Sequence, residues 1–275
     1  MDLVRASHLY KVFGKNERQV IERLKAGESR EELASLGTAA VIDVSFEVAK
    51  GETFVVMGLS GSGKSTLIRM INGLWSPSEG TVEVAGKVVS DMNDAQLRVL
   101  RRDHVSMVFQ HFALLPHLTV RENAAYGLKL QGKLKQKERL EKANEWLNTV
   151  GLNGWGDKYP HQLSGGMQQR VGLARALAAE TDILLMDEAF SALDPLIRRE
   201  MQDQLLELQG ALNKTIIFIT HDLNEAMYLG DHIAVMRNGR VAQIGTSDEI
   251  LTQPADDYVA DFVQDVDRSL SLIHI

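Results

Sequence analysis

The sequence has 275 residues, 44% hydrophobic and 24% charged, which supplies enough apolar side chains for one large globular domain or two small ones. A formal net charge of −7 argues against a protein that binds nucleic acid by neutralising its phosphates. With no cysteine the chain cannot form disulfides or cysteine-ligated metal sites. The N-terminal residues 1–8 show no apolar core of signal-peptide length, and no apolar run approaches the length of a membrane span. We therefore expect a soluble protein that reaches a membrane only through a partner.

The first distinctive segment is residues 15–38, which reads as a charged insertion with apolar residues at helical spacing. Ser29-Arg30-Glu31-Glu32 has the pattern of a capping box, so a helix is predicted to begin there. We expect the whole insertion to form a packed helical hairpin at the surface. Residues 42–48 then alternate between apolar and polar side chains, which predicts a half-buried strand.

The next feature is the run Gly58-Leu59-Ser60-Gly61-Ser62-Gly63-Lys64-Ser65, which fits the phosphate-loop pattern G-x-x-x-x-G-K-[ST] at every fixed position. An apolar run, residues 54–57, precedes it as a strand buried on both faces, and a helix is predicted to follow it. Backbone N–H groups of such a loop and helix start point at phosphate oxygens. Lys64 would reach the β- and γ-phosphates, and the Ser65 hydroxyl would bind Mg²⁺. The run therefore predicts a site for a nucleoside triphosphate.

The remaining chain alternates between strand and helix patterns, which indicates an α/β fold with a parallel sheet. Strands are predicted at 81–84, 105–109, 183–186 and 215–220, and helices at 121–130, 138–150, 165–179 and 196–212. Because helical patterns dominate residues 111–179, we expect a helical subdomain there, inserted into the core. Asn238-Gly239 between two apolar runs predicts a β-hairpin.

Two further runs carry polar groups suited to phosphate chemistry. The apolar strand that ends near residue 186 is followed by Asp187, which can hold Mg²⁺ opposite Ser65, and by Glu188, which can polarise the attacking water. Ser164 is a natural N-cap, and the two glycines after it leave the next backbone N–H groups open. This helix start is a second candidate anion site.

Together and in this order, the runs resemble those of ATPase subunits of ATP-binding cassette (ABC) transporters over residues 1–265, with residues 266–275 left as a tail. The resemblance implies a P-loop NTPase core with a parallel sheet, an antiparallel β part and an inserted helical subdomain. It makes Gln110 the Q-loop glutamine and Leu163 to Gln168 the signature, with Met167 where the commonest version has glutamine. Ser191-Ala192-Leu193-Asp194 resembles the D-loop.

The resemblance also assigns roles to single residues, with ATP and Mg²⁺ as ligands. The implied catalytic residues are Glu188, His221 and Lys64, and the implied metal ligands are Ser65, Gln110 and Asp187. Phe13 most resembles the aromatic residue that stacks on adenine, with Tyr10 as the alternative. The other implied nucleotide contacts are Gly58, Leu59, Ser60, Gly61, Ser62, Gly63, Lys64, Ser65, Thr66, Ser164, Gly165, Gly166 and Asp194.

The family implies an ATP-dependent head-to-tail dimer with a second copy, a separate integral membrane permease and, indirectly, an extracytoplasmic substrate-binding protein. It places the protein at the cytoplasmic face of the membrane, with residues 111–124 forming the groove for a permease helix. Three features resemble the branch that imports glycine betaine, proline betaine or choline: the insertion, Leu59 where many relatives have proline, and residues 107–117.

Other functions stay open from the residues alone. An ABC importer for another polar solute is one alternative. A non-transport ABC ATPase acting on nucleic acid or ribosomes is a second, although the acidic chain lacks the basic surface it would need. An unrelated phosphate-loop kinase or GTPase would give no role to His221 or to the glycines after Ser164.

Overall fold

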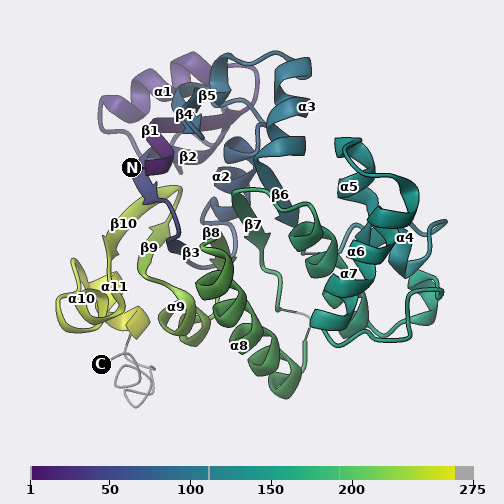
Figure 1. Cartoon of the computed structure of the whole chain (residues 1–275). Helices are drawn as coiled ribbons and strands as arrows, with labels where there is room; N and C mark the ends of the chain where they lie inside the picture. The colour runs from purple at the N-terminus through teal and green to yellow at the C-terminus, as the bar shows by residue number, and fades with distance from the viewer. Residues whose placement is uncertain (1, 111, 192, 264–275) are drawn as a thin grey trace. The chain divides into compact units, whose positions relative to one another are not determined.

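A computed structural model of the chain describes residues 2–110, 112–191 and 193–263 (Figure 1). The chain divides into two compact units, the first made of residues up to Leu97 and from Ile217 onward, the second of Arg98 to Ile216. The expected domain end at residue 265 and the tail 266–275 lie outside the described residues. Within the described ranges, no helix combines the length and the apolar character needed to cross a membrane.

The first unit contains an antiparallel sheet with the strand order β2-β1-β4-β5. Its strands are β1 (Asp2–Phe13), β2 (Thr38–Ala49), β4 (Glu79–Val84) and β5 (Lys87–Val88). From Ile42 to Ala49, β2 alternates buried and exposed residues, so the predicted half-buried strand is confirmed. The antiparallel β part implied by the family resemblance is this sheet.

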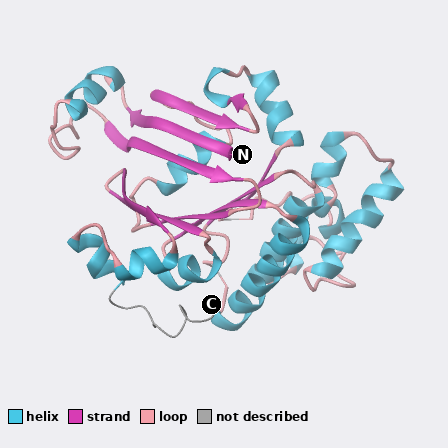
Figure 2. Cartoon of the chain, turned by 60° about the vertical axis from the view of Figure 1, so that its left-hand side comes forward, coloured by secondary structure: helices cyan, strands magenta, loops and turns pink. Residues whose placement is uncertain are grey.

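The strands that carry the phosphate loop lie in the same unit. β3 (Thr53–Met57) is buried throughout and pairs in parallel with β9 (His232–Arg237). β9 pairs with β10 (Arg240–Gly245) across the predicted hairpin, where Asn238 and Gly239 have φ values of 50° and 83°. Phe46 of β2 stacks on Phe54 of β3 with ring centroids 5.0 Å apart, which joins the two layers of strands seen in Figure 2. The helical elements of this unit are α1 (Glu17–Lys25), α2 (Lys64–Ile71), η1 (Val89–Asp91), α9 (Leu223–Leu229), α10 (Ser247–Thr252) and α11 (Asp257–Val263).

The insertion is packed, but it is not the helical hairpin that we expected. Only α1 forms, and Arg30 to Leu36 make successive turns instead of a second helix. The Ser29–Glu32 capping contacts are present, since the Ser29 N–H donates to Glu32 Oε2 at 2.8 Å and the Glu32 N–H donates to Ser29 Oγ at 3.3 Å. Leu33 is buried with Val20, Ile21 and Leu24 of α1, and this cluster anchors the insertion to β1 and β2.

The second unit combines two parallel strands with a group of helices. β6 (Val105–Val108) pairs in parallel with β7 (Ile183–Asp187). Its helical elements are α4 (Val120–Ala124), α5 (Tyr126–Gln131), α6 (Gln136–Thr149), η2 (Pro160–Gln162), α7 (Gly165–Ala178) and α8 (Pro195–Leu212). The single helix expected at 121–130 is divided into α4 and α5 at Ala125. Two elements cross the unit boundary: α3 (Asp94–Asp103) and β8 (Thr215–Thr220).

Candidate functional site

The phosphate-loop sequence forms the turn between β3 and α2, and two of its glycines are required by close backbone contacts. Gly58 has φ 150°, and a Cβ there would lie 2.3 Å from the Met236 carbonyl oxygen. Gly63 has φ 104°, and a Cβ there would lie 2.2 Å from the Ala40 carbonyl oxygen. Any side chain at either position would force the loop away from its supporting strands.

Polar groups of this loop fit a phosphate. The Lys64 side chain is 4% exposed, and Nζ donates to the carbonyls of Gly58 at 2.8 Å and Leu59 at 3.1 Å. The Ser62 hydroxyl is buried and has no hydrogen-bond partner among the described residues. Gly63 offers no side chain to cap α2, so the first backbone N–H groups of α2 face the loop without a side-chain acceptor from the N-cap. A cation, a buried hydroxyl and an uncapped helix start together suit an anion.

The turn of the β9–β10 hairpin supports the phosphate loop, which the sequence did not predict. The tip of the β9–β10 hairpin lies against it, since the Gly239 N–H donates to the Ser62 carbonyl at 3.0 Å. The Gly239 carbonyl in turn accepts from the Ile42 N–H at 2.8 Å. The Asn238-Gly239 pair signalled the hairpin, but nothing in its local pattern indicated which loop the turn would support.

The structure distinguishes the two aromatic candidates for adenine stacking. Phe13 is 37% exposed and packs edge-to-face on Trp75, with ring centroids 5.0 Å apart. Tyr10 is 4% exposed and belongs to the buried cluster under the insertion, where burial raises the pKa of its phenol. Tyr10 therefore offers no ring face to a nucleotide, and that alternative is wrong. Phe13 stays the prediction.

His221 directly follows β8 and is exposed. Its two chain neighbours are fixed by hydrogen bonds: the Asp222 N–H donates to Thr220 Oγ1 at 2.9 Å, and that hydroxyl donates to the buried Glu225 carboxylate at 2.6 Å. Asp222 also caps α9. The sequence did not single out Thr220 or Glu225, which hold the backbone on both sides of the histidine.

In the second unit, the two acidic residues at the end of β7 have different environments. Asp187 is the last residue of the strand and is 4% exposed. Glu188 has a left-handed φ of 47°, so the chain turns sharply between the two residues. Gln110 Nε2 donates to Glu188 Oε2 at 3.1 Å, so the structure brings the expected Q-loop and catalytic residues into contact. Because the amide nitrogen makes this bond, the amide oxygen is the atom that could serve as a metal ligand.

The predicted second helix start is also confirmed. Ser164 is the N-cap of α7, and its hydroxyl accepts from the Met167 N–H at 3.4 Å. A Cβ on Gly165 would meet nothing within 4 Å, whereas one on Gly166 would lie 3.1 Å from Leu193 Cδ2. Asp194 caps α8 by accepting from the Ile197 N–H at 3.1 Å, so its carboxylate has a structural partner as well as the expected nucleotide role. His111 and Ala192, which belong to the expected loops, lie outside the described residues.

The expected site residues are divided between the two units. Those in the first unit are Phe13, Gly58 to Thr66 and His221, and those in the second are Gln110, Ser164 to Gly166, Asp187, Glu188 and Asp194. Each half has internal contacts that position its polar groups, and in the second unit the Gln110–Glu188 hydrogen bond joins two of the expected residues directly.

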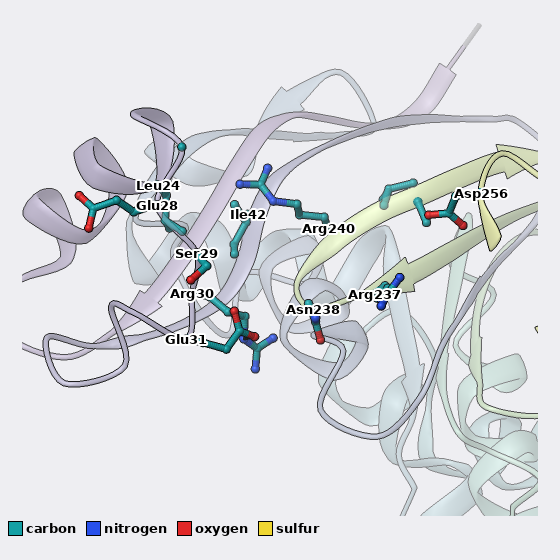
Figure 3. A pocket seen from close by; sticks show the side chains of 13 residues that line it. Leu24, Glu28, Ser29, Arg30, Glu31, Ile42, Arg237, Asn238, Arg240 and Asp256 are labelled. Atoms are coloured by element: carbon teal, nitrogen blue, oxygen red, sulfur yellow. Dashed lines mark ion pairs between the residues drawn. The ribbon is translucent and has the colours of Figure 1, made fainter. Parts of the chain in front are cut away.

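A groove that the sequence did not predict lies in the first unit between the insertion and the β9–β10 hairpin (Figure 3). Its volume is about 440 Å³. Both charges line it: the arginines are Arg30, Arg237 and Arg240, and the acids are Glu28, Glu31 and Asp256. Arg237 also lies 4.5 Å over the Tyr258 ring. The insertion therefore creates a charged concave surface next to the hairpin that braces the phosphate loop.

Comparison with known proteins places the chain in a family. The sequence model of the family described as ABC transporter matches residues 41–191. The chain belongs to the ABC transporter family. Among solved structures, a dimeric ATP-binding cassette in a post-hydrolysis state bound to ADP and Pi is similar, with a TM-score of 0.78 and 32% identity over 89% of this chain and 98% of that one. The ABC cassette fold, and with it the α/β class predicted from the sequence, is confirmed.

Relatives of this ABC family member narrow the similarity further. The chain is 54% identical to the glycine betaine transport ATP-binding protein of Bacillus subtilis over 97% of its length and 64% of that protein. It is 53% identical to the glycine betaine/proline betaine transport system ATP-binding protein of Escherichia coli, over 95% of this chain and 66% of the relative. It is 48% identical to the trimethylamine N-oxide transport system ATP-binding protein of Ruegeria pomeroyi, over 97% of this chain and 78% of the relative. The chain thus spans 64–66% of the first two of these relatives.

Proposed function

We propose that this chain is the ATP-hydrolysing subunit of an ABC importer that drives uptake of a quaternary amine osmolyte through a separate membrane permease. The similarity that carries the proposal is the 54% identity, over 97% of the chain, to a glycine betaine transport ATP-binding protein. Glycine betaine, proline betaine and choline are the candidate substrates. An importer for another polar solute is the second candidate, since the substrate would be recognised by a different polypeptide.

The first unit would supply residues that bind the nucleotide. The phosphate loop would bind the β- and γ-phosphates through its backbone N–H groups, and Lys64 would exchange the Gly58 and Leu59 carbonyls for phosphate oxygens. Phe13, exposed beside Trp75, would stack on the adenine ring. His221, whose neighbours on both sides are fixed by the Thr220 hydroxyl, would contact the γ-phosphate.

The second unit supplies the group that activates water. Glu188 would act as general base, and Gln110 holds its carboxylate in place through the 3.1 Å hydrogen bond. Mg²⁺, held by Ser65, Asp187 and the Gln110 amide oxygen, would neutralise charge on the phosphates when bound. Asp187 is buried at the end of β7, where little space is left for its carboxylate to change orientation.

A second copy of the chain would complete the reaction centre. The similar solved cassette is dimeric and bound to ADP and Pi. We infer that Ser164, Gly165 and Gly166 of one copy would close over ATP held by the loop of the other, because the Ser164-capped start of α7 presents open N–H groups to an anion. ATP would then stabilise the closed dimer, and hydrolysis would reopen it.

The permease would dock on the second unit, and through it the complex would lie at the cytoplasmic face of the membrane. A hollow of about 200 Å³ is lined by Leu118 and Glu122, both within the expected groove at 111–124, together with Ala125, Tyr126, Lys129, Gln136, Arg139 and Leu140. This mixture of aliphatic, aromatic and charged side chains suits a short amphipathic helix. Substrate would reach the permease from an extracytoplasmic binding protein, and no nucleic acid takes part.

Uptake in cells tests the proposal. Radiolabelled glycine betaine and choline are supplied to cells that carry the wild-type gene, lack it, or carry Glu188→Gln. Loss of uptake in both the deletion and the variant is expected. Normal uptake in the deletion strain would overturn the substrate class, and uptake of a different solute would then be measured in the same strains.

A further inference from the structure

The loop that follows Gln110 has an unusual backbone. Phe112 and Ala113 have φ values of 60° and 47°, so two consecutive residues that are not glycine lie in the left-handed region. A single such residue is uncommon, and each is strained unless its surroundings hold it. The surroundings of these two residues therefore determine whether the loop keeps this shape.

Arg175 provides that support from the signature helix α7. Its Nη1 donates to the Ala113 carbonyl at 2.7 Å, and its Nη2 donates to the Phe112 carbonyl at 2.8 Å. In extended backbone, successive carbonyls point to opposite sides, whereas in helical conformations of either hand they point the same way. The left-handed pair thus presents two parallel acceptors to one planar guanidinium, which a lysine ammonium could not match.

The cation is held at this place without a neutralising partner. No carboxylate pairs with Arg175 in the part of the chain that the structure describes, and burial lowers the pKa of its guanidinium. Arg175 is partly buried, and the bonds recorded for its guanidinium are those to the Phe112 and Ala113 carbonyls.

The opposite end of the loop is fixed separately. Asn123 is fully buried, and its Nδ2 donates to the carbonyls of Leu115, Leu118 and Thr119 at 3.0, 3.1 and 3.0 Å. Its Oδ1 accepts from the Leu115 N–H at 2.8 Å. With that end held, the bonds from Arg175 hold the other described end of the loop, at Phe112 and Ala113.

We propose that Arg175 is a positioning residue for hydrolysis, which holds the 112–113 backbone so that Gln110 stays within hydrogen-bond distance of Glu188. The inference rests on the proposed function, since it assigns a role to a contact in the proposed reaction centre. Through Arg175, helix α7, which begins at the signature, is linked to the loop that follows Gln110. A shift of about 1 Å in a catalytic contact can lower a rate roughly 100-fold.

The test compares purified wild-type protein with Arg175→Lys and Arg175→Met, each alone and in a Gln110→Ala background, and uses Arg102→Met as control. Arg102 is an exposed arginine of the same unit, paired with Asp103. In Arg175→Lys we expect kcat to fall about 10- to 100-fold while KM for ATP stays within about twofold, because the phosphate loop is untouched. Backbone amide exchange across residues 112–115 should accelerate. In the Gln110→Ala background the same change should lower kcat less than about twofold further, because its effect passes through Gln110.

Each outcome bears on the inference. A wild-type kcat in Arg175→Lys, or a loss that is fully additive with Gln110→Ala, would overturn it. Arg175→Met leaves two loop carbonyls without their donor, which can prevent folding. The lysine variant, which keeps the charge but loses the planar pair of donors, therefore decides the question. If the wild-type protein hydrolysed no ATP, the proposed function would fail. Unchanged amide exchange at 112–115 in Arg175→Lys would separately refute the claim that Arg175 holds the 112–113 backbone.

Discussion

Replacing Glu188 with glutamine is expected to lower ATP turnover at least ~100-fold, because the side chain can no longer accept a proton from the attacking water. A loss of 10² to 10⁴ corresponds to roughly 2.7 to 5.5 kcal/mol on the barrier. The substitution preserves shape: an amide oxygen at the position of Oε2 could still accept the hydrogen bond that Gln110 Nε2 makes at 3.1 Å. The expected loss of turnover therefore measures the loss of a proton-accepting carboxylate and not the displacement of the side chain.

ATP binding should survive in Glu188→Gln, because the phosphate-loop contacts of Lys64 lie in the other unit. The variant should consequently accumulate as an ATP-bound dimer. Phosphate release measures turnover, a fluorescent nucleotide measures binding, and light scattering after size exclusion measures the dimer. The control is Glu145→Gln, which removes the charge of an exposed carboxylate on α6 and should hydrolyse ATP at the wild-type rate. Turnover of Glu188→Gln within about threefold of wild type would remove Glu188 from the mechanism and refute the reasoning.

Four further changes test other parts of the structure. Ser164→Arg should abolish hydrolysis but leave ATP affinity of the monomer intact in a nucleotide titration, and lost monomer binding would contradict a site shared between two copies. Gly63→Ala should abolish ATP binding, since its Cβ would lie 2.2 Å from the Ala40 carbonyl oxygen, and normal affinity would show that the loop can shift. Asn123→Ala should lower the free energy of unfolding by about 2–4 kcal/mol in urea titrations, because it leaves buried backbone groups unpaired, and a loss under ~1 kcal/mol would mean that water replaces the amide. The Glu122 carboxylate accepts from the Thr119 N–H at the start of α4, which lowers its pKa below the ordinary value for glutamate. The stability that it adds over Glu122→Gln should therefore be present at pH 7 and disappear as the pH falls through its folded pKa. A difference in Tm that is constant with pH would contradict this.

The parts of the fold that could be predicted from sequence are those decided by neighbours in the chain. The alternation in β2 reflects one buried and one exposed face. The Asn238-Gly239 turn needs two residues with positive φ, which few other pairs tolerate. The phosphate loop needs glycine at Gly58 and Gly63 because backbone atoms approach within 2.3 Å of a Cβ position. In each case a local constraint limits which residues can occur.

Predictions failed where distant packing or segment length decided the outcome. The capping contacts at Ser29 formed as predicted, yet residues 30–36 make successive turns, and the packing of Leu33 against α1 holds them there. Tyr10 looked available for a nucleotide because its strand position alone does not show that the insertion covers it. The helix α9, seven residues long, is too short to show helical periodicity in sequence. The bonds from Arg175 and Asn123 to loop carbonyls join residues whose side chains carry no recognisable pattern, so no motif marked them.

The two units use the same physical device for different purposes. In each, a cation on a helix binds two consecutive carbonyls of a functional loop: Lys64 holds those of Gly58 and Leu59, and Arg175 holds those of Phe112 and Ala113. An ammonium has three rotatable donors without a fixed plane, so Lys64 can turn from carbonyls to phosphate oxygens with little rearrangement. A guanidinium fork fits one arrangement of acceptors, so Arg175 keeps the loop in a single conformation. This difference between the two cations explains why a lysine lies at the loop that must accept a ligand. It also explains why an arginine lies at the loop that must stay fixed.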